Sequence, residues 1–156
     1  MKELEIITKV IISSYKELCP EEKELIEVAK ASTESAYAPY SKFKVGAAVL
    51  LENGEIITGN NQENVAYPSG LCAERVAVFY ANAKFPNTKI KMIAVAAYFQ
   101  NDYTDHISPC GSCRQVLQEV EARYKSPIRI LLYGKNEIYI VESAKDLMPL
   151  NFEIEN

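Results

Sequence analysis

Tryptophan is absent from the 156 residues, histidine occurs once, and there are only 6 glycines and 7 prolines. So little glycine and proline excludes collagen-like and low-complexity chains. No apolar run approaches the roughly 18 residues that a membrane-spanning helix needs. Residues 1–5 include two glutamates where a secretory signal would carry a basic segment. We therefore expect a cytoplasmic protein with no membrane partner.

Positively charged residues are also fewer than negatively charged ones. The chain has 17 Lys and Arg and 21 Asp and Glu, which gives a net charge of −4. Binding along a phosphate backbone needs clustered Lys and Arg, so we expect no nucleic-acid partner. The hydrophobic fraction of 48% and the length fit one compact domain. No repeat or linker interrupts residues 1–156, which we interpret as a single domain.

The four cysteines are the most informative residues in the composition. A chain of this length can bury an adequate core without disulfide bonds. In a reducing compartment, thiols are more often metal ligands or catalytic groups than cross-links.

Apolar spacing predicts alternating helices and strands. Strands are expected within residues 3–14, 43–51, 55–58, 90–99, 128–133 and 137–141, and helices from Pro20 and within 69–85 and 109–124. Asn53 and Gly54 predict a hairpin turn, and Ser143 predicts the cap of a short final helix. The order predicts an α/β fold, a three-layer α/β/α arrangement with a mixed five-stranded central sheet plus an extra N-terminal strand.

Three of the cysteines lie at two predicted helix starts. Cys110 and Cys113 form a Cys-x-x-Cys motif after Pro109, and Cys72 opens the preceding helix. Zinc accepts thiolates in tetrahedral geometry, and a catalytic site leaves the fourth position open. Glu74 follows Cys72 by two residues, so its carboxylate can move a proton from zinc-bound water to a substrate.

These residues taken singly also have simpler interpretations. Cys-x-x-Cys occurs in redox pairs and in structural zinc sites, where Cys19 would be the only remaining cysteine for a fourth position. Glu74 could be an ordinary acidic residue in a first helical turn. Phe43 could belong to the core, and the single histidine, His106, to a loop. Cys19 itself fits a free thiol.

Four blocks in register resemble the cytidine deaminases, specifically the small, all-cysteine, homotetrameric class. The blocks are residues 36–48, 59–64, 72–75 and 108–117. The resemblance covers most of residues 20–152 and leaves 1–19 as an N-terminal extension. Residues 68–71, Pro-Ser-Gly-Leu, depart from the family pattern, which leaves the substrate contacts of this loop open.

The resemblance implies a role for each matching residue. Cys72, Cys110 and Cys113 would bind one Zn²⁺ per chain, and Glu74 would be the catalytic proton shuttle. Asn61 and Glu63 would bind the ribose 3′-hydroxyl, Phe43 would pack on the pyrimidine, and the Ala73 amide would face the base carbonyl. Arg75 would donate hydrogen bonds to the ligand sulfurs.

The implied activity is that of a zinc-dependent hydrolase of pyrimidine salvage. It would convert cytidine and 2′-deoxycytidine to the uridine forms with release of ammonia, as a homotetramer. Three alternatives stay open: a deaminase of another cytosine nucleoside, a polynucleotide cytosine editor, and a non-catalytic zinc module. The sequence leaves the ribose preference and the tolerance of modified bases undecided.

Overall fold

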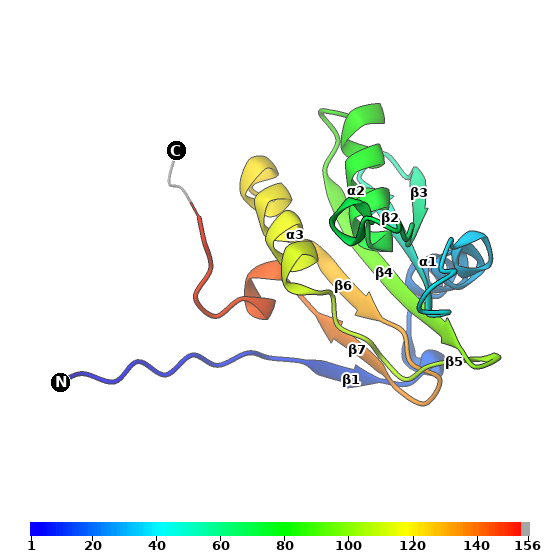
Figure 1. Ribbon diagram of the computed structural model, residues 1–156. Helices are drawn as coiled ribbons and strands as arrows, with labels where there is room; N and C mark the ends of the chain where they lie inside the picture. The colour runs from blue at the N-terminus through cyan, green and yellow to red at the C-terminus, as the bar shows by residue number, and fades with distance from the viewer. Residues whose placement is uncertain (154–156) are drawn as a thin grey trace.

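The computed structural model describes residues 1–153, which form a seven-stranded mixed sheet and three α-helices (Figure 1). Six strands follow the order β1-β7-β6-β4-β2-β3, and β5 pairs with β4. Among the strands of residues 1–153, β4 and β6 pair in parallel and the other pairs are antiparallel. The strands are β1 (Ile11–Ser13), β2 (Lys44–Leu51), β3 (Ile56–Asn60), β4 (Ile90–Phe99), β5 (Asp102–Tyr103), β6 (Arg129–Leu132) and β7 (Ile138–Val141).

The helices cover both faces of this sheet (Figure 1). They are α1 (Pro20–Ser32), α2 (Ala73–Lys84) and α3 (Gly111–Tyr124). Leu25, Ile26 and Ala29 of α1 belong to the apolar core on one face, whereas α2 and α3 contribute to the core on the other. The five central strands β3-β2-β4-β6-β7 between these helices confirm the predicted three-layer arrangement. No helix within residues 1–153 has the length and apolarity to cross a membrane.

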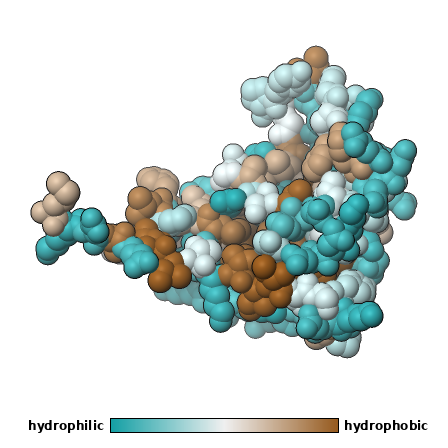
Figure 2. Space-filling model, turned by 90° about the horizontal axis from the view of Figure 1, so that it is seen from below, coloured by the Kyte–Doolittle hydropathy of each residue, from teal (hydrophilic) through white to brown (hydrophobic). Residues whose placement is uncertain are grey.

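The N-terminal strand is shorter than the alternation of residues 3–14 predicts. β1 covers Ile11–Ser13 and pairs antiparallel with β7 at the edge of the sheet. Residues 1–10 have no regular secondary structure and project from the body, with apolar side chains along them (Figure 2). β7 has only four residues, so it offers the preceding residues no partner strand.

The hairpin predicted at Asn53 and Gly54 joins β2 to β3. Only Gly54 takes the left-handed backbone, with φ 86°, whereas a two-residue turn of the expected kind needs it at both positions. A second hairpin, absent from the prediction, joins β4 to β5 through Gln100 and Asn101, with φ 52° and 64°. Neither residue is glycine, so the usual turn signal is missing there.

Gly59 in β3 lets α2 pack closely against the sheet. A Cβ atom at this position would collide with the backbone of Ala73 and Ala77 in α2. The absent side chain therefore sets the position of the first turn of α2 relative to β3.

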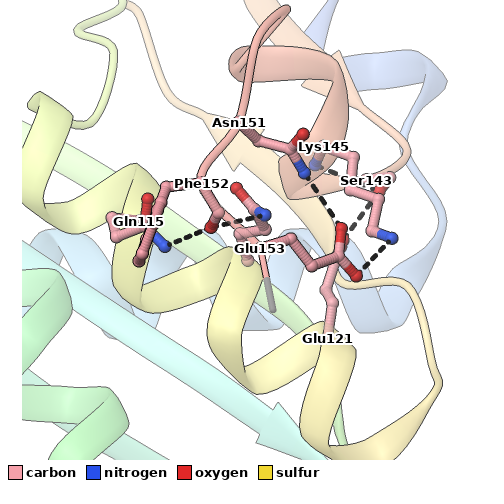
Figure 3. A network of polar contacts seen from close by, with 8 residues as sticks. Gln115, Glu121, Ser143, Lys145, Asn151, Phe152 and Glu153 are labelled. Atoms are coloured by element: carbon pink, nitrogen blue, oxygen red, sulfur yellow. Dashed lines mark hydrogen bonds and ion pairs between the residues drawn. The ribbon is translucent and has the colours of Figure 1, made fainter. Parts of the chain in front are cut away.

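A buried carboxylate fixes the far end of α3 (Figure 3). Glu121, 4% exposed, accepts hydrogen bonds from the backbone N–H of Ile128 (2.6 Å) and Ala144 (2.8 Å), and from Ser143 Oγ (2.8 Å). Ser143 also caps the predicted final helix, a 3-10 turn over Ala144–Leu147. One side chain thus ties α3 to the segments before β6 and after β7.

Nearer the start of α3, the C-terminal segment lies against the helix. Gln115 and Gln118 donate from Nε2 to the carbonyl oxygen of Phe152, at 3.0 and 3.4 Å (Figure 3).

Candidate active site

The three predicted zinc ligands meet where two helices begin. Cys72 is the N-cap residue of α2, Cys110 is the N-cap residue of α3, and Cys113 lies in the first turn of α3. Their Sγ atoms all lie within 4.8 Å of one another, with Cys72–Cys110 at 3.8 Å and Cys110–Cys113 at 3.5 Å. Cys113 is fully buried, while Cys110 is exposed, so the cluster is open on one side only.

These sulfur distances suit a tetrahedral metal. A Zn–S bond of about 2.3 Å at the tetrahedral angle separates two ligand sulfurs by about 3.8 Å. A disulfide would need about 2.05 Å, and all four cysteines are free. Cys19 caps α1 and is not part of the sulfur cluster, so it supplies no fourth ligand. The cluster therefore fits one metal ion with a coordination position left for water or substrate.

The electrostatics of the cluster favour an anionic sulfur at Cys72. A hydrogen bond from the Cys113 thiol, together with the neighbouring Arg75 guanidinium, lowers the pKa of Cys72 to about 5. The same hydrogen bond and burial raise the pKa of Cys113, because it serves as the donor to that thiolate. Arg75 Nη2 donates to Cys72 Sγ at 3.9 Å. The N-termini of two helices add further positive potential at the sulfurs.

Glu74 occupies the second position of α2, beside the sulfurs. Its side chain is only 5% exposed, and burial raises the pKa of the carboxyl, with a further contribution from the Cys72 thiolate. A carboxyl with a raised pKa exchanges a proton near neutral pH more readily than a surface glutamate. Glu74 lies next to the sulfur cluster and lines a cleft, a position that suits proton transfer.

A cleft of about 720 Å³ opens in front of the sulfurs. Its walls come from the segment before β2, the end of β3, the loop before α2 and the loop before α3. The lining residues used below are Tyr40, Ser41, Asn61, Glu63, Tyr67, Leu71, Cys72, Glu74, Arg75 and Cys110. This volume is within the range of small-molecule sites.

The predicted ribose-binding pair lies in this cleft and is held in place by backbone contacts. Asn61 accepts from the Val45 N–H at 2.8 Å and donates from Nδ2 to the Phe43 carbonyl at 2.9 Å. Glu63 accepts from Ser41 Oγ and from the Tyr40 N–H, the latter at 2.9 Å. These hydrogen bonds, that of Ser41 first, lower the pKa of Glu63 and keep it an acceptor.

The chain segment that carries Asn61 and Glu63 also contacts the loop before the predicted ligand Cys72. Gln62 exchanges two backbone hydrogen bonds with Leu71, at 2.9 and 3.0 Å, and Leu71 precedes the ligand Cys72. The loop of residues 68–71, which departs from the family pattern, thus contributes to the cleft wall. It also fixes the spacing between the sulfurs and the pair Asn61 and Glu63. The pairing of Gln62 with Leu71 could not be predicted from the sequence.

Two predicted substrate contacts are placed differently. Phe43 packs on Phe99, with ring centroids 5.7 Å apart, and does not line the cleft. Ala73 is fully buried as the first residue of α2 and also stays outside the lining. Their roles stay predictions. His106 stacks on Tyr139 with centroids 3.5 Å apart and is not part of the sulfur cluster.

Known proteins are similar to this chain in sequence. The family model "Cytidine and deoxycytidylate deaminase zinc-binding region" matches residues 20–125. A cytidine deaminase of Sporosarcina psychrophila is 47% identical over 97 residues, which are 62% of this chain and 68% of that protein. One of Halalkalibacterium halodurans is 42% identical over 96 residues, or 62% and 69% of the two chains.

Solved structures extend the similarity to the fold. The crystal structure of cytidine deaminase from Burkholderia pseudomallei matches with a TM-score of 0.71 and 40% identity, over 83% of this chain and 97% of that one. Cytidine deaminase from Mycobacterium tuberculosis matches at a TM-score of 0.67 and 31% identity, over 85% and 98%. The chain belongs to the cytidine deaminase family.

Proposed function

We propose that this protein hydrolyses the 4-amino group of cytidine and 2′-deoxycytidine, giving the uridine forms and ammonia. The observation that carries the proposal is the buried Glu74 carboxyl beside three clustered cysteine sulfurs, at a cleft that holds Asn61 and Glu63. The substrate is a small neutral nucleoside, which agrees with a cleft of about 720 Å³ in an acidic chain.

Cys72, Cys110 and Cys113 would hold one zinc ion, as their spacing fits its geometry. When bound, zinc supplies Lewis acidity that lowers the pKa of water toward neutrality. Three thiolates reduce that acidity by their negative charge. Arg75, which donates to Cys72 Sγ, offsets part of this charge.

Glu74 carries the proton transfers. It takes one proton from the attacking water and delivers it to N3 of the pyrimidine while the water oxygen bonds to C4. It then takes the second proton of that oxygen and delivers it to the 4-amino nitrogen. The C4–N bond breaks, ammonia leaves, and N3 keeps its proton, which gives the uracil ring.

The other cleft residues orient the nucleoside. Glu63 would accept a hydrogen bond from the ribose 3′-hydroxyl, and the second hydrogen of Asn61 Nδ2 would donate to the same oxygen. The Ala73 N–H, at the N-terminus of α2, would face the base carbonyl. Phe43, whose ring lies against Phe99, would pack on the pyrimidine. Because a polynucleotide esterifies the 3′ oxygen, this pair disfavours a polymer substrate.

Assembly and location follow from the same proposal. The exposed rings Phe79 and Tyr80 on α2 are apolar surface suited to subunit contact, and we propose a homotetramer in the cytoplasm.

A nucleoside panel tests the substrate assignment. Ammonia release is measured with cytidine, 2′-deoxycytidine, 3′-deoxycytidine, free cytosine and a cytosine oligonucleotide, together with zinc bound per chain. We expect turnover of the first two with about one zinc per chain, weak turnover of the 3′-deoxy form, and none of the oligonucleotide. Oligonucleotide turnover without nucleoside turnover would assign the cleft to a polymer instead.

A further inference from the structure

The N-terminal segment, defined here as residues 2–10, is an extended arm that pairs with no strand within residues 1–153. The arm continues β1, which is the last strand at this edge of the sheet. Thr8 Oγ1 donates to the Asp146 carbonyl at 2.8 Å, so the arm is held to the body near its base. Beyond Thr8 it projects away from the body (Figures 1 and 2).

The arm leaves much apolar surface uncovered. Leu4 and Ile7 are 79% and 80% exposed, and Ile6 and Val10 are 45% and 40% exposed. The free edge of β1 also presents unpaired backbone groups, which are a template for another strand. An exposed apolar strand on an open edge is a site of strand addition.

We propose that the arm pairs antiparallel with the same arm of a second copy of this chain, with Ile7 opposite Ile7 at a two-fold axis. In this register the residue numbers of opposite residues add to 14. Glu5 then faces Lys9 twice, and Leu4 faces Val10 twice. The proposal needs no property of the active site.

Charged and apolar side chains together favour this register among the neighbouring ones. A shift that makes the numbers add to 12 also forms ion pairs, between Glu3 and Lys9, but it places Glu5 opposite Ile7 and Leu4 opposite Thr8. A sum of 16 places Lys9 opposite Ile7 and forms no ion pair. Of the three, only the proposed register pairs Glu5 with Lys9 and Leu4 with an apolar side chain. Opposite charges and paired apolar side chains are the cross-strand combinations that stabilise an antiparallel pair. Self-complementarity of this kind is what an isologous interface requires.

This register separates the two bodies along the paired arms. Ile12 of one copy lies opposite Lys2 of the other. The Ile12 residues of the two copies are therefore ten residues apart along the strands, or about 34 Å at about 3.4 Å per residue. Each body is attached to its own arm on the outer edge, through β7. The two sheets would therefore join into one, with the arms as the central pair.

Cysteine cross-linking tests the pairing. Ile7→Cys is introduced into Cys19→Ser protein, which removes the exposed thiol outside the metal cluster. Opposite residues of an antiparallel pair have Cα atoms about 4.5–5.5 Å apart, which permits a disulfide. Mild oxidation of the zinc-loaded protein should convert most of it to a covalent dimer on a non-reducing denaturing gel.

Ile6→Cys in the same background is the matched control. Its thiol would face Thr8, and the Ile6 positions of the two copies would be about 7–8 Å apart, near or beyond disulfide reach. We expect at least fivefold less dimer than with Ile7→Cys. Cys19→Ser protein without an added cysteine should give no dimer.

Charge reversal tests the register separately. Glu5→Lys or Lys9→Glu places like charges opposite each other twice, and should lower the Ile7→Cys dimer yield several-fold. The combined reversal should restore it. Absence of a dimer with Ile7→Cys, equal yields at both positions, or no rescue by the double reversal would overturn the proposal. Ammonia release by the same samples is read independently, so a failure here leaves the proposed activity untouched.

Discussion

At the residue scale, the metal cluster depends on where three cysteines stand in two helices. Cys110 and Cys113 are three residues apart at a helix start, so one turn brings both sulfurs together. This part of the site could be predicted from sequence because it is local. The position of Cys72 beside them depends on how α2 and α3 pack; its place at a helix start made it a candidate ligand, and the family resemblance assigned it to the same metal.

Phe43 and Glu63 show the limit of the same reasoning. A resemblance assigns Phe43 a substrate contact, but the side chain packs on Phe99, which lies at the far end of β4 in the sequence. The support of Glu63 by Ser41 and Tyr40 was not predicted either. Both features are set by the folding of the segment 37–43 over the end of β3.

Glu63→Gln should weaken recognition of the ribose. The amide keeps the volume but replaces one acceptor oxygen by a donor, so kcat/KM for cytidine should fall about 10- to 100-fold. Steady-state rates of ammonia release measure the effect. Glu55→Gln, in the exposed turn between β2 and β3, is the matched control and should be neutral.

The 3′-hydroxyl provides the second half of this test. If Glu63 binds it, 3′-deoxycytidine should be processed equally by Glu63→Gln and by the unaltered protein. A full loss with 3′-deoxycytidine as well would show that Glu63 supports the loop 40–41 only.

At the element scale, α3 links the metal cluster to the C-terminal part of the chain. Its first turn holds Cys113, and its last turns hold Glu121. Sequence periodicity places the helix correctly but marks Glu121 as an ordinary polar residue. Its partners, Ile128, Ser143 and Ala144, come from two other segments, so only the tertiary structure reveals the buried carboxylate.

Glu121→Leu should destabilise the fold by about 3 kcal/mol. It leaves the N–H groups of Ile128 and Ala144 buried without an acceptor, and each such group costs about 1–3 kcal/mol. Glu121→Gln retains a carbonyl oxygen for both and should cost much less. Urea unfolding of the three proteins measures the difference; equal losses for Leu and Gln would contradict the assigned role.

Glu22 links α1 to the sheet and predicts a pH effect. Burial opposes its ionisation, but hydrogen bonds from the Cys19 N–H at 2.9 Å and Arg129 Nε at 2.8 Å outweigh it and lower the pKa. A lowered folded-state pKa stabilises the fold above the unfolded-state pKa, and this stabilisation disappears as the pH falls through the folded-state value.

Glu22→Gln should therefore cost about 1 kcal/mol at pH 7 and nothing well below pH 4. Denaturant unfolding from pH 7 to pH 3 follows the convergence of the two proteins. Glu24→Gln, at an exposed position on the same helix, should match the unaltered protein throughout. A gap that stays constant with pH would remove the electrostatic explanation.

Two strands show why alternation alone is an incomplete guide. Residues 3–10 alternate like a strand but meet no neighbour within the described chain, so only Ile11–Ser13 pair. β5 has two residues, too few for a pattern, yet it forms because Tyr103 packs edge-on against Tyr98 and Tyr133. A strand forms only beside a partner strand, and the local alternation pattern does not show which segment that partner is.

At the scale of the whole molecule, the sheet brings together four segments that are distant in sequence. The end of β3, the loop before α2 and the loop before α3 meet at one cleft, with the segment before β2 as its outer wall. A mixed five-stranded sheet containing a hairpin was predictable from the sequence, whereas the order of its strands is seen only in the structure. The cleft, which brings the sulfurs and the carboxyl groups of Glu63 and Glu74 together, follows only from the assembled fold.

The most direct test of the account compares cytidine turnover by the zinc-loaded protein and by Glu74→Gln. The glutamine keeps the shape of the side chain but cannot carry a proton, and loss of general acid–base catalysis should lower kcat by about 10²–10⁴-fold or more. Zinc analysis should give about one ion per chain for both proteins, because Glu74 is not among the three clustered sulfur ligands. Equal rates for the two proteins, or no cytidine turnover by the fully zinc-loaded unaltered protein, would contradict the assignment.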